Sequence, residues 1–201
     1  NDKQVVVVPA GQNSSDFGSA TRVYWTFKVL GHDAVTILDG GQRAWLAAGK
    51  EVSTDPVVPK AVAFNANFRP ELVATADDVA KARAEGVALV DARPVSQFKG
   101  EAKSGVVARP GAVPGAKNIP QSKFYNDQDG AFVAADVIEN LVADAGVSKD
   151  SKEITYCNTG HWASVAWFGL SEVMGNKNTA MYDGSMTEWA ADPNREMVIP
   201  E

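Results

Sequence analysis

The feature that most restricts the fold of this chain is an internal repeat. When the 201-residue sequence is shifted by 144 positions, its first segment falls on its last segment. The identical pairs include Gly31 with Gly175, Asp39 with Asp183, Gly40 with Gly184 and Trp45 with Trp189. Similarity at a fixed offset indicates repeated structural units. We interpret the repeat as the duplication of one domain, and two similar units of independent origin are the alternative.

Strands alternate with helices in both copies. In the first copy, the apolar spacing predicts strands at 5–8 and 35–38 and helices at 19–30 and 42–48. In the longer second copy, it predicts strands at 87–90 and 153–156 and helices at 75–84, 134–145 and 162–174. This alternation predicts an α/β fold, in which helices cover both faces of a parallel sheet.

The first copy is too short to form a closed domain. Two strands and two helices bury too little surface to cover a sheet on both faces. We therefore expect residues 1–58 to be the C-terminal half of one domain, 59–70 a linker and 71–201 a complete domain. We expect the N-terminal half of the first domain to be a partner of this chain. That half was cut away, was lost, or is supplied as a separate chain.

Charge and composition exclude several classes of function. Because 25 Asp and Glu residues outnumber 19 Lys and Arg residues, the net charge is -6 and we expect no nucleic-acid partner. No apolar run approaches the roughly 18 residues of a membrane helix, so we expect no membrane association. The single cysteine excludes an internal disulfide and a multi-cysteine zinc site. The sequence has no glycine-rich loop that binds the phosphates of a nucleotide, so we expect no cofactor. The sequence leaves the compartment open between cytoplasm and periplasm.

Cys157 is the chemical centre of the sequence. It lies between a predicted buried strand and a predicted helix, at the edge where parallel sheets bind ligands. Backbone N–H groups of the turn and the start of the helix would stabilise a thiolate and hold a small anion against it. Such surroundings lower a cysteine pKa from about 8.5 into the range of about 3.5 to 7.5. We therefore expect an accessible Cys157 with a lowered pKa.

Several motifs occur in a characteristic order. They are Val-Asp-Ala-Arg at 90–93, Pro-Gly-Ala-x-Asn-Ile-Pro at 114–120, Cys157-x-x-Gly160 and Tyr-Asp-Gly-Ser-x-x-Glu-Trp at 182–189, preceded by Gly31-His32 and Leu38-Asp39-Gly40-Gly41. The chain thereby resembles the tandem-domain rhodanese sulfurtransferases, the family of thiosulfate and 3-mercaptopyruvate sulfurtransferases. The resemblance implies a rhodanese-like fold, with 71–201 as the catalytic domain and 1–58 as part of an inactive one.

The resemblance also implies a reaction. Cys157 would take a sulfane sulfur from a small anionic donor, become a persulfide, and pass the sulfur to a thiol or cyanide acceptor. The substrate-binding candidates are the loop residues Asn158, Thr159, Gly160, His161 and Trp162, together with Arg93 and Arg109.

The loop departs from the family pattern in its charge. Asn158 and Thr159 stand where thiosulfate-using relatives carry cations, and Gln97 stands where tandem members place a donor-binding arginine. A lost hydrogen bond to a charged group costs about 1.5 to 3 kcal/mol, so a doubly charged donor is disfavoured. Trp162 would instead select a bulkier or less charged donor, while His161 or Arg109 would restore part of the positive field.

Other interpretations remain open for these residues. Cys157 could be a buried structural thiol, or the domain a non-catalytic module that binds a partner or senses oxidation. Arg93 could serve as the ion-pair partner of Asp91. A metal site at Cys157 and His161 is disfavoured, because two ligands are too few. Phosphatase activity is disfavoured as well, because the Cys-x5-Arg loop of phosphatases needs an arginine where this chain has Ala163.

Overall fold

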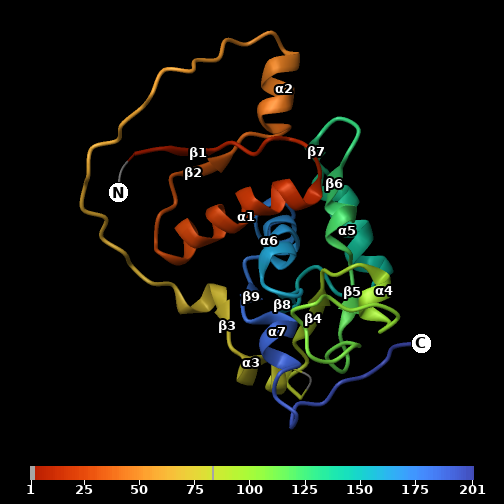
Figure 1. The fold of residues 1–201 in the computed structure, drawn as a ribbon. Coiled ribbons are helices and arrows are strands. Elements are labelled where there is room, and N and C mark those ends of the chain that lie inside the picture. Colours follow the sequence, from red (N-terminus) through yellow and green to blue (C-terminus); the bar gives the residue numbers. More distant parts are fainter. Residues whose placement is uncertain (1–2, 83) are drawn as a thin grey trace.

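The computed structural model describes residues 3–82 and 84–201, and its centre is a five-stranded parallel sheet (Figure 1). The strand order is β3-β9-β8-β4-β5. These strands are β3 Val73–Ala74, β4 Ala88–Asp91, β5 Lys117–Asn118, β8 Glu153–Tyr156 and β9 Thr179–Tyr182. In the register, β4 runs beside β8 with Asp91 opposite Tyr156. The strand that leads to Cys157 is therefore the middle strand of the sheet, which confirms the predicted α/β class.

Helices cover both faces of this sheet. They are α3 Ala76–Ala82, α4 Val95–Phe98, α5 Ala135–Asp144, α6 His161–Trp167 with a π-helix at Phe168–Val173, α7 Ser185–Trp189, and short 3₁₀ turns at Pro70–Leu72 and Gln121–Phe124. Alternate residues of a strand point to opposite faces. Accordingly, Ile154 and Tyr156 pack in one apolar cluster with Trp189, whereas Cys157 packs in the other with Trp167. A small antiparallel hairpin, β6 Tyr125–Asn126 and β7 Ala131–Phe132, packs against the start of α1, where the ring of Phe17 lies 5.4 Å from that of Tyr125 and 5.1 Å from that of Phe132.

The first segment forms a separate two-stranded parallel sheet. Its elements are β1 Val5–Val7, α1 Ser14–Val29, β2 Val35–Ile37 and α2 Gly41–Ala47. This strand-helix-strand-helix order also holds for β8, α6, β9 and α7, as the proposed duplication requires, although the duplication itself stays a prediction. Helix α1 begins five residues before the predicted start, because Asn13 Oδ1 accepts hydrogen bonds from the N–H groups of Ser15 and Asp16 at its N-terminus.

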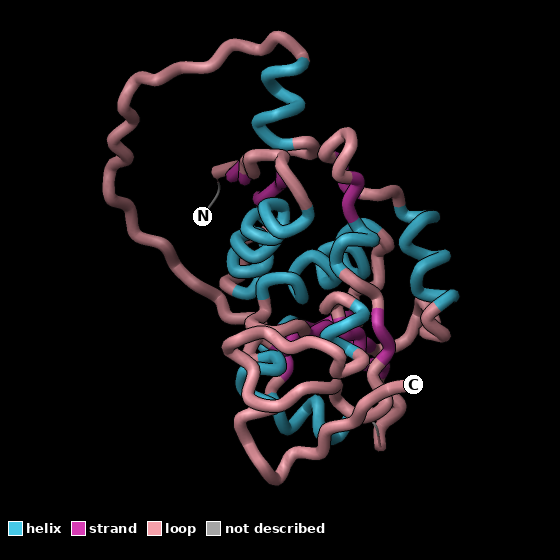
Figure 2. Tube along the Cα trace, turned by 45° about the vertical axis from the view of Figure 1, so that its right-hand side comes forward, coloured by secondary structure: helices cyan, strands magenta, loops and turns pink. Residues whose placement is uncertain are grey.

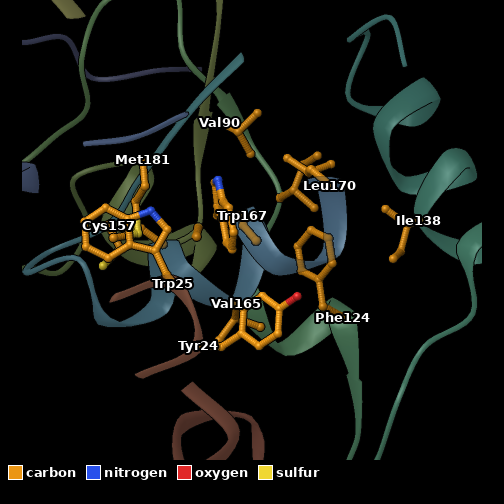
Figure 3. Packing of buried hydrophobic residues seen from close by; sticks show 14 of the residues in the cluster. Tyr24, Trp25, Val90, Phe124, Ile138, Cys157, Val165, Trp167, Leu170 and Met181 are labelled. Atoms are coloured by element: carbon orange, nitrogen blue, oxygen red, sulfur yellow. The ribbon is translucent and has the colours of Figure 1, made fainter. Parts of the chain in front are cut away.

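Helix α1 shares its core with residues of the longer C-terminal part of the chain. Tyr24, Trp25 and Val29 belong to the same buried cluster as Trp167 and Cys157. Figure 3 shows several of these side chains around the indole of Trp167, whose Nε1–H donates to the Thr179 carbonyl at 3.0 Å. The division into residues 1–58, 59–70 and 71–201 stays a prediction, but the cluster spans the proposed boundary.

Residues 51–69 contain no helix or strand. In Figures 1 and 2 they follow a wide arc that leaves the body of the molecule after α2 and returns to it before β3. The arc exposes several large apolar side chains, which are Val52, Val57, Val58, Val62, Phe64 and Phe68. It rejoins the body where Asn67 and Arg69 donate backbone hydrogen bonds to the carbonyls of Leu30 and Val29. Across residues 3–82 and 84–201, no helix has the length and apolarity needed to cross a membrane.

Candidate active site

Cys157 lies on the turn that joins β8 to α6, as the sequence predicted. The turn lies at the carboxyl end of the central strand, and Gly160 precedes the helix with a φ of +80°. A side chain at Gly160 would collide with Asp183 Oδ1 and Arg22 Nη1, so the position requires glycine for space as well as for conformation. These two groups form a partly exposed ion pair directly beside the turn.

Two residues of helix α7, Ser185 and Thr187, hold the backbone of the Cys157 turn by hydrogen bonds. Ser185 Oγ accepts hydrogen bonds from the N–H groups of Cys157 and Gly160, both at 3.1 Å, and its hydroxyl donates to the Tyr182 carbonyl at 2.9 Å. Ser185 has a φ of +50°, unusual for a residue with a side chain. The carbonyl of Asn158 accepts from the hydroxyl of Thr187 at 2.7 Å. The backbone around Cys157 is therefore held on several sides.

The sulfur of Cys157 is more enclosed than the sequence suggested. The residue is 1% exposed, and burial raises the pKa of its thiol above the ordinary value. Backbone N–H groups of Thr159, Ala163 and Trp162 act in the opposite direction, because they donate hydrogen bonds to the sulfur. The prediction of an accessible thiol with a lowered pKa was wrong: N–H groups of the turn and of the start of α6 do contact the sulfur, but burial outweighs their effect on its pKa.

A hollow of about 360 Å³ opens beside Cys157. Five of the residues that line it come from the turn and the start of α6, namely Cys157, Asn158, Thr159, His161 and Trp162. Three more come from elsewhere, namely Ser15, Ser104 and Val106. None of these eight residues is Lys or Arg, so the hollow is polar and aromatic without a fixed cation. The hollow has room for a small molecule beside Cys157.

The predicted loop residues gather at this hollow. Gly160 shapes the turn, and the other four line the space. The side-chain amide of Asn158 donates a hydrogen bond to Gln97 Oε1 at 2.8 Å. Gln97, which stands where tandem family members place an arginine, therefore contacts the loop. His161 Nε2 lies 2.7 Å from the Ser15 carbonyl. Because a carbonyl only accepts, His161 carries a proton on Nε2.

The two predicted arginine ligands lie elsewhere. Arg93 is 1% exposed, and its guanidinium is bound by Asp91 (Nη2 to Oδ2, 2.6 Å) and by the Gly111 carbonyl at 2.9 Å. Arg109 donates to the carbonyls of Ala190, Asp192 and Arg195 at 2.7 to 3.0 Å. Neither side chain lines the hollow, because both are committed to structural contacts. Pairing of Arg93 with Asp91 was the alternative interpretation, and the structure confirms that contact.

Sequence reasoning missed several residues at this site. Ser15 and Ser104 are far from Cys157 along the chain, and no local pattern marks them. Gly18 also lies at this site: a Cβ there would lie 2.7 Å from His161 Nε2, so the glycine lets α1 approach the loop closely. Ser185 stands inside the Tyr-Asp-Gly-Ser motif, but only the fold reveals its contact with Cys157. Among the described residues, no three His, Cys, Asp or Glu side chains form a cluster that could hold a metal.

Comparison with known proteins assigns the family. The rhodanese-like domain pattern matches residues 75–192, and the chain belongs to the rhodanese-like family. A Haloferax volcanii protein named "Putative thiosulfate sulfurtransferase" is 39% identical over 189 residues, which cover 91% of this chain and 65% of that protein. A Mycobacterium tuberculosis protein of the same name is 34% identical over 92% of this chain and 68% of its own length. The chain thus spans about two thirds of these relatives.

Solved structures of the same architecture also match. The anaerobic ergothioneine biosynthesis enzyme of Chlorobium limicola, in complex with trimethyl histidine, aligns with a TM-score of 0.86 and 26% identity. The alignment covers 96% of this chain and 50% of that enzyme. An EanB variant with a cysteine persulfide in a tetrahedral intermediate state with ergothioneine aligns with a TM-score of 0.85 and 25% identity, over 96% of this chain and 51% of that one. The predicted rhodanese-like fold is confirmed.

Proposed function

We propose that this chain is a sulfurtransferase that carries a sulfane sulfur on Cys157. One observation supports the proposal most strongly: the only thiol of the chain lies in a ring of backbone N–H groups beside a hollow at the carboxyl edge of the sheet. The family, the names of the relatives and the cysteine persulfide of one solved neighbour agree with it.

The first displacement loads the enzyme. The Cys157 thiolate attacks the outer sulfur of a donor such as thiosulfate, a new S–S bond forms, and the donor's own S–S bond breaks. Sulfite leaves with the electron pair of the broken bond, and Cys157 becomes a persulfide with a negative terminal sulfur. The N–H groups of Thr159, Trp162 and Ala163, which hydrogen-bond the Cys157 sulfur, would stabilise the negative charge of the persulfide without reorganisation.

The second displacement returns the enzyme to its starting state. The carbon of cyanide, or the sulfur of a thiolate, attacks the terminal sulfur of the persulfide. The S–S bond to Cys157 breaks, and its electron pair restores the Cys157 thiolate. Because each half uses the same cysteine, the kinetics would be ping-pong.

Donors with one negative charge or a bulkier body suit the hollow better than thiosulfate. None of its lining residues is Lys or Arg, whereas thiosulfate carries two charges that must lose water on entry. A 3-mercaptopyruvate type of donor carries one carboxylate, which Thr159 and the amide of Asn158 could contact. For this donor, the C–S bond breaks, and the carbon takes up a proton as pyruvate leaves.

The experiment is to incubate the protein separately with thiosulfate and 3-mercaptopyruvate and to record its intact mass. We expect the mass of one added sulfur atom, its removal by cyanide with formation of thiocyanate, and no addition to a Cys157→Ser variant. Sulfur transfer by the Cys157→Ser variant would refute the mechanism.

A non-catalytic rhodanese-like module is the second candidate, favoured by the burial of the Cys157 thiol. Burial of this kind slows the attack of a thiol on any donor and its oxidation. An unmodified wild-type mass after incubation with both donors would support this candidate over the enzyme.

The domain organisation leads to a proposal about the partner. The outer face of α1 carries an apolar hollow of about 270 Å³ lined by Val23, Phe27, Leu30 and Phe64, among others. We propose that the remaining half of the first domain covers this face, either within a longer chain or as a separate one. A hydrophobic fluorescent dye should therefore bind this face, and a Val23→Ser variant should bind less of it; equal binding by both proteins would contradict the proposal.

A further inference from the structure

Ser15, in the first segment, forms hydrogen bonds with two side chains that line the hollow beside Cys157. The indole Nε1–H of Trp162 donates to Ser15 Oγ at 2.9 Å, and His161 Nε2 donates to the Ser15 carbonyl at 2.7 Å. All three residues line the hollow. Two side chains of the proposed anion-binding loop are thus oriented by a serine that precedes Trp162 by 147 positions.

Ser15 is itself firmly placed. Its N–H donates to Asn13 Oδ1 at 2.9 Å, at the capped start of α1. Six residues further along α1, the hydroxyls of Thr21 and Ser164 lie 2.8 Å apart and are both buried. Helix α1 therefore cannot slide along α6 without breaking contacts, and Ser15 presents its hydroxyl at a fixed point of the hollow.

The orientation of Trp162 decides what the hollow can accept. An indole is a large flat surface, and with Val106 it gives the space an apolar side. The remaining lining groups are hydroxyls, an amide and an imidazole, without Lys or Arg. Such a space suits a molecule with at most one negative charge and a flat or apolar body. If the Ser15 hydroxyl were absent, the indole would lose its only described hydrogen-bond acceptor and would no longer be fixed.

We propose that Ser15 is a positioning residue that sets the donor specificity of Cys157 through Trp162. The proposal rests on the proposed sulfurtransferase function. It assigns to the first segment a part in substrate selection, and it names the donor class as monoanions with a flat or apolar body. Benzenethiosulfonate is a suitable probe, because its outer sulfur transfers by the same displacement and benzenesulfinate leaves with the electron pair.

The experiment compares benzenethiosulfonate with thiosulfate in the whole chain. We expect wild-type protein to prefer the aromatic donor by kcat/KM. A Ser15→Ala variant should lose about 3- to 10-fold of this preference, through KM more than kcat, because one hydrogen bond to a neutral group is lost. Ser15→Thr keeps the hydroxyl and should restore the preference. Ser19→Ala, at an exposed position one turn along the same helix, is the matched control.

A spectroscopic measurement separates positioning from general damage. The indole ¹H–¹⁵N resonance of Trp162, identified by its loss in Trp162→Phe, should shift in Ser15→Ala and stay unchanged in Ser19→Ala. Should Ser15→Ala fail to fold, the Trp162→Phe variant provides the test. It removes the donor of the same hydrogen bond, so its preference for the aromatic donor should fall in the same way.

The outcomes separate the two proposals. Wild-type protein that accepts sulfur from no donor would overturn the proposed function and this inference together. Wild-type protein that is loaded normally, alongside Ser15→Ala and Trp162→Phe variants with an unchanged donor preference, would overturn the inference alone. An unmoved Trp162 resonance in Ser15→Ala would overturn it as well, since the hydrogen bond would then not orient the indole.

Discussion

The backbone N–H of Cys157 donates a hydrogen bond to Ser185 Oγ at 3.1 Å, which ties the proposed nucleophile to the first residue of α7. Ser185 also accepts from Gly160 N–H and donates to the Tyr182 carbonyl. One buried hydroxyl therefore satisfies three backbone groups at the end of two neighbouring strands. The shape of the turn depends on it.

Replacing Ser185 should damage both stability and sulfur transfer. In Ser185→Ala, three buried backbone groups lose a partner, and we expect a loss of about 2 to 5 kcal/mol in the free energy of unfolding. The turn should relax, so persulfide formation should become roughly 10- to 100-fold slower. Urea unfolding and intact mass measure the two effects. The control is Ser151→Ala, which removes one exposed hydroxyl contact at the opposite end of β8 and should change neither the stability nor the loading rate much. A wild-type loading rate in Ser185→Ala would show that the turn does not need the Ser185 hydroxyl.

The rate of sulfur loading should depend steeply on pH. Because burial raises the pKa of Cys157, the reactive thiolate is a minor species at neutral pH. Below the pKa, its fraction grows about tenfold per pH unit, so the loading rate should keep rising from about pH 6 to 9. Stopped incubations analysed by mass would measure it, with circular dichroism as a control for folding. A rate that levels off below neutral pH would mean that the amides outweigh burial.

Glu153 should make the fold less stable as the pH rises. It is fully buried at the start of β8, where burial raises the pKa of its carboxyl from 4.5 to about 7. As the pH increases, the unfolded chain releases this proton before the folded chain does. The free energy of unfolding therefore falls between pH 4.5 and about pH 7 and is constant above pH 7. The total loss is roughly 3 kcal/mol. Glu153→Gln should remove this slope in urea unfolding, whereas exposed Glu139→Gln should keep it; an unchanged slope in Glu153→Gln would assign the effect to other groups.

Arg93 should matter for folding and not for donor binding. In Arg93→Met, Asp91 is left as an unpaired buried charge, which typically costs about 3 to 5 kcal/mol. The KM for thiosulfate should stay within a factor of two or so under conditions where the variant is folded. Lys149→Met breaks an exposed pair with Glu139 and should cost less than about 1 kcal/mol. A large rise in KM for Arg93→Met would restore Arg93 as a substrate ligand.

The first segment should stay attached after the chain is cut in the arc. Lys60 is exposed in a stretch without helix or strand, so we expect trypsin to cleave there early. Because Tyr24 and Trp25 share a core with residues after the cut, the two pieces should elute together from a size-exclusion column. Lys60→Gln should delay the cleavage. Separation of the pieces without denaturant would contradict a shared core.

Much of the architecture could be predicted from sequence alone. The strand at 153–156, the turn at Cys157, the glycine at 160 and the parallel α/β class all follow from local patterns, and each agrees with the structure. These features depend on neighbours along the chain, namely the alternation of apolar residues and the conformational needs of a turn. The loop residues at the hollow were predictable for the same reason.

The surroundings of Cys157 were decided by the tertiary structure. The direction of its pKa shift, the commitment of Arg93 and Arg109 to other contacts, and the arrival of Ser15 and Ser185 at the turn depend on segments far apart in sequence. Desolvation and hydrogen bonding act through space, so a pattern read along the chain cannot weigh them. The sequence determined which residue carries the thiol and on what turn; only the packing of α1, α6 and α7 determined how deeply that thiol lies and which groups face it.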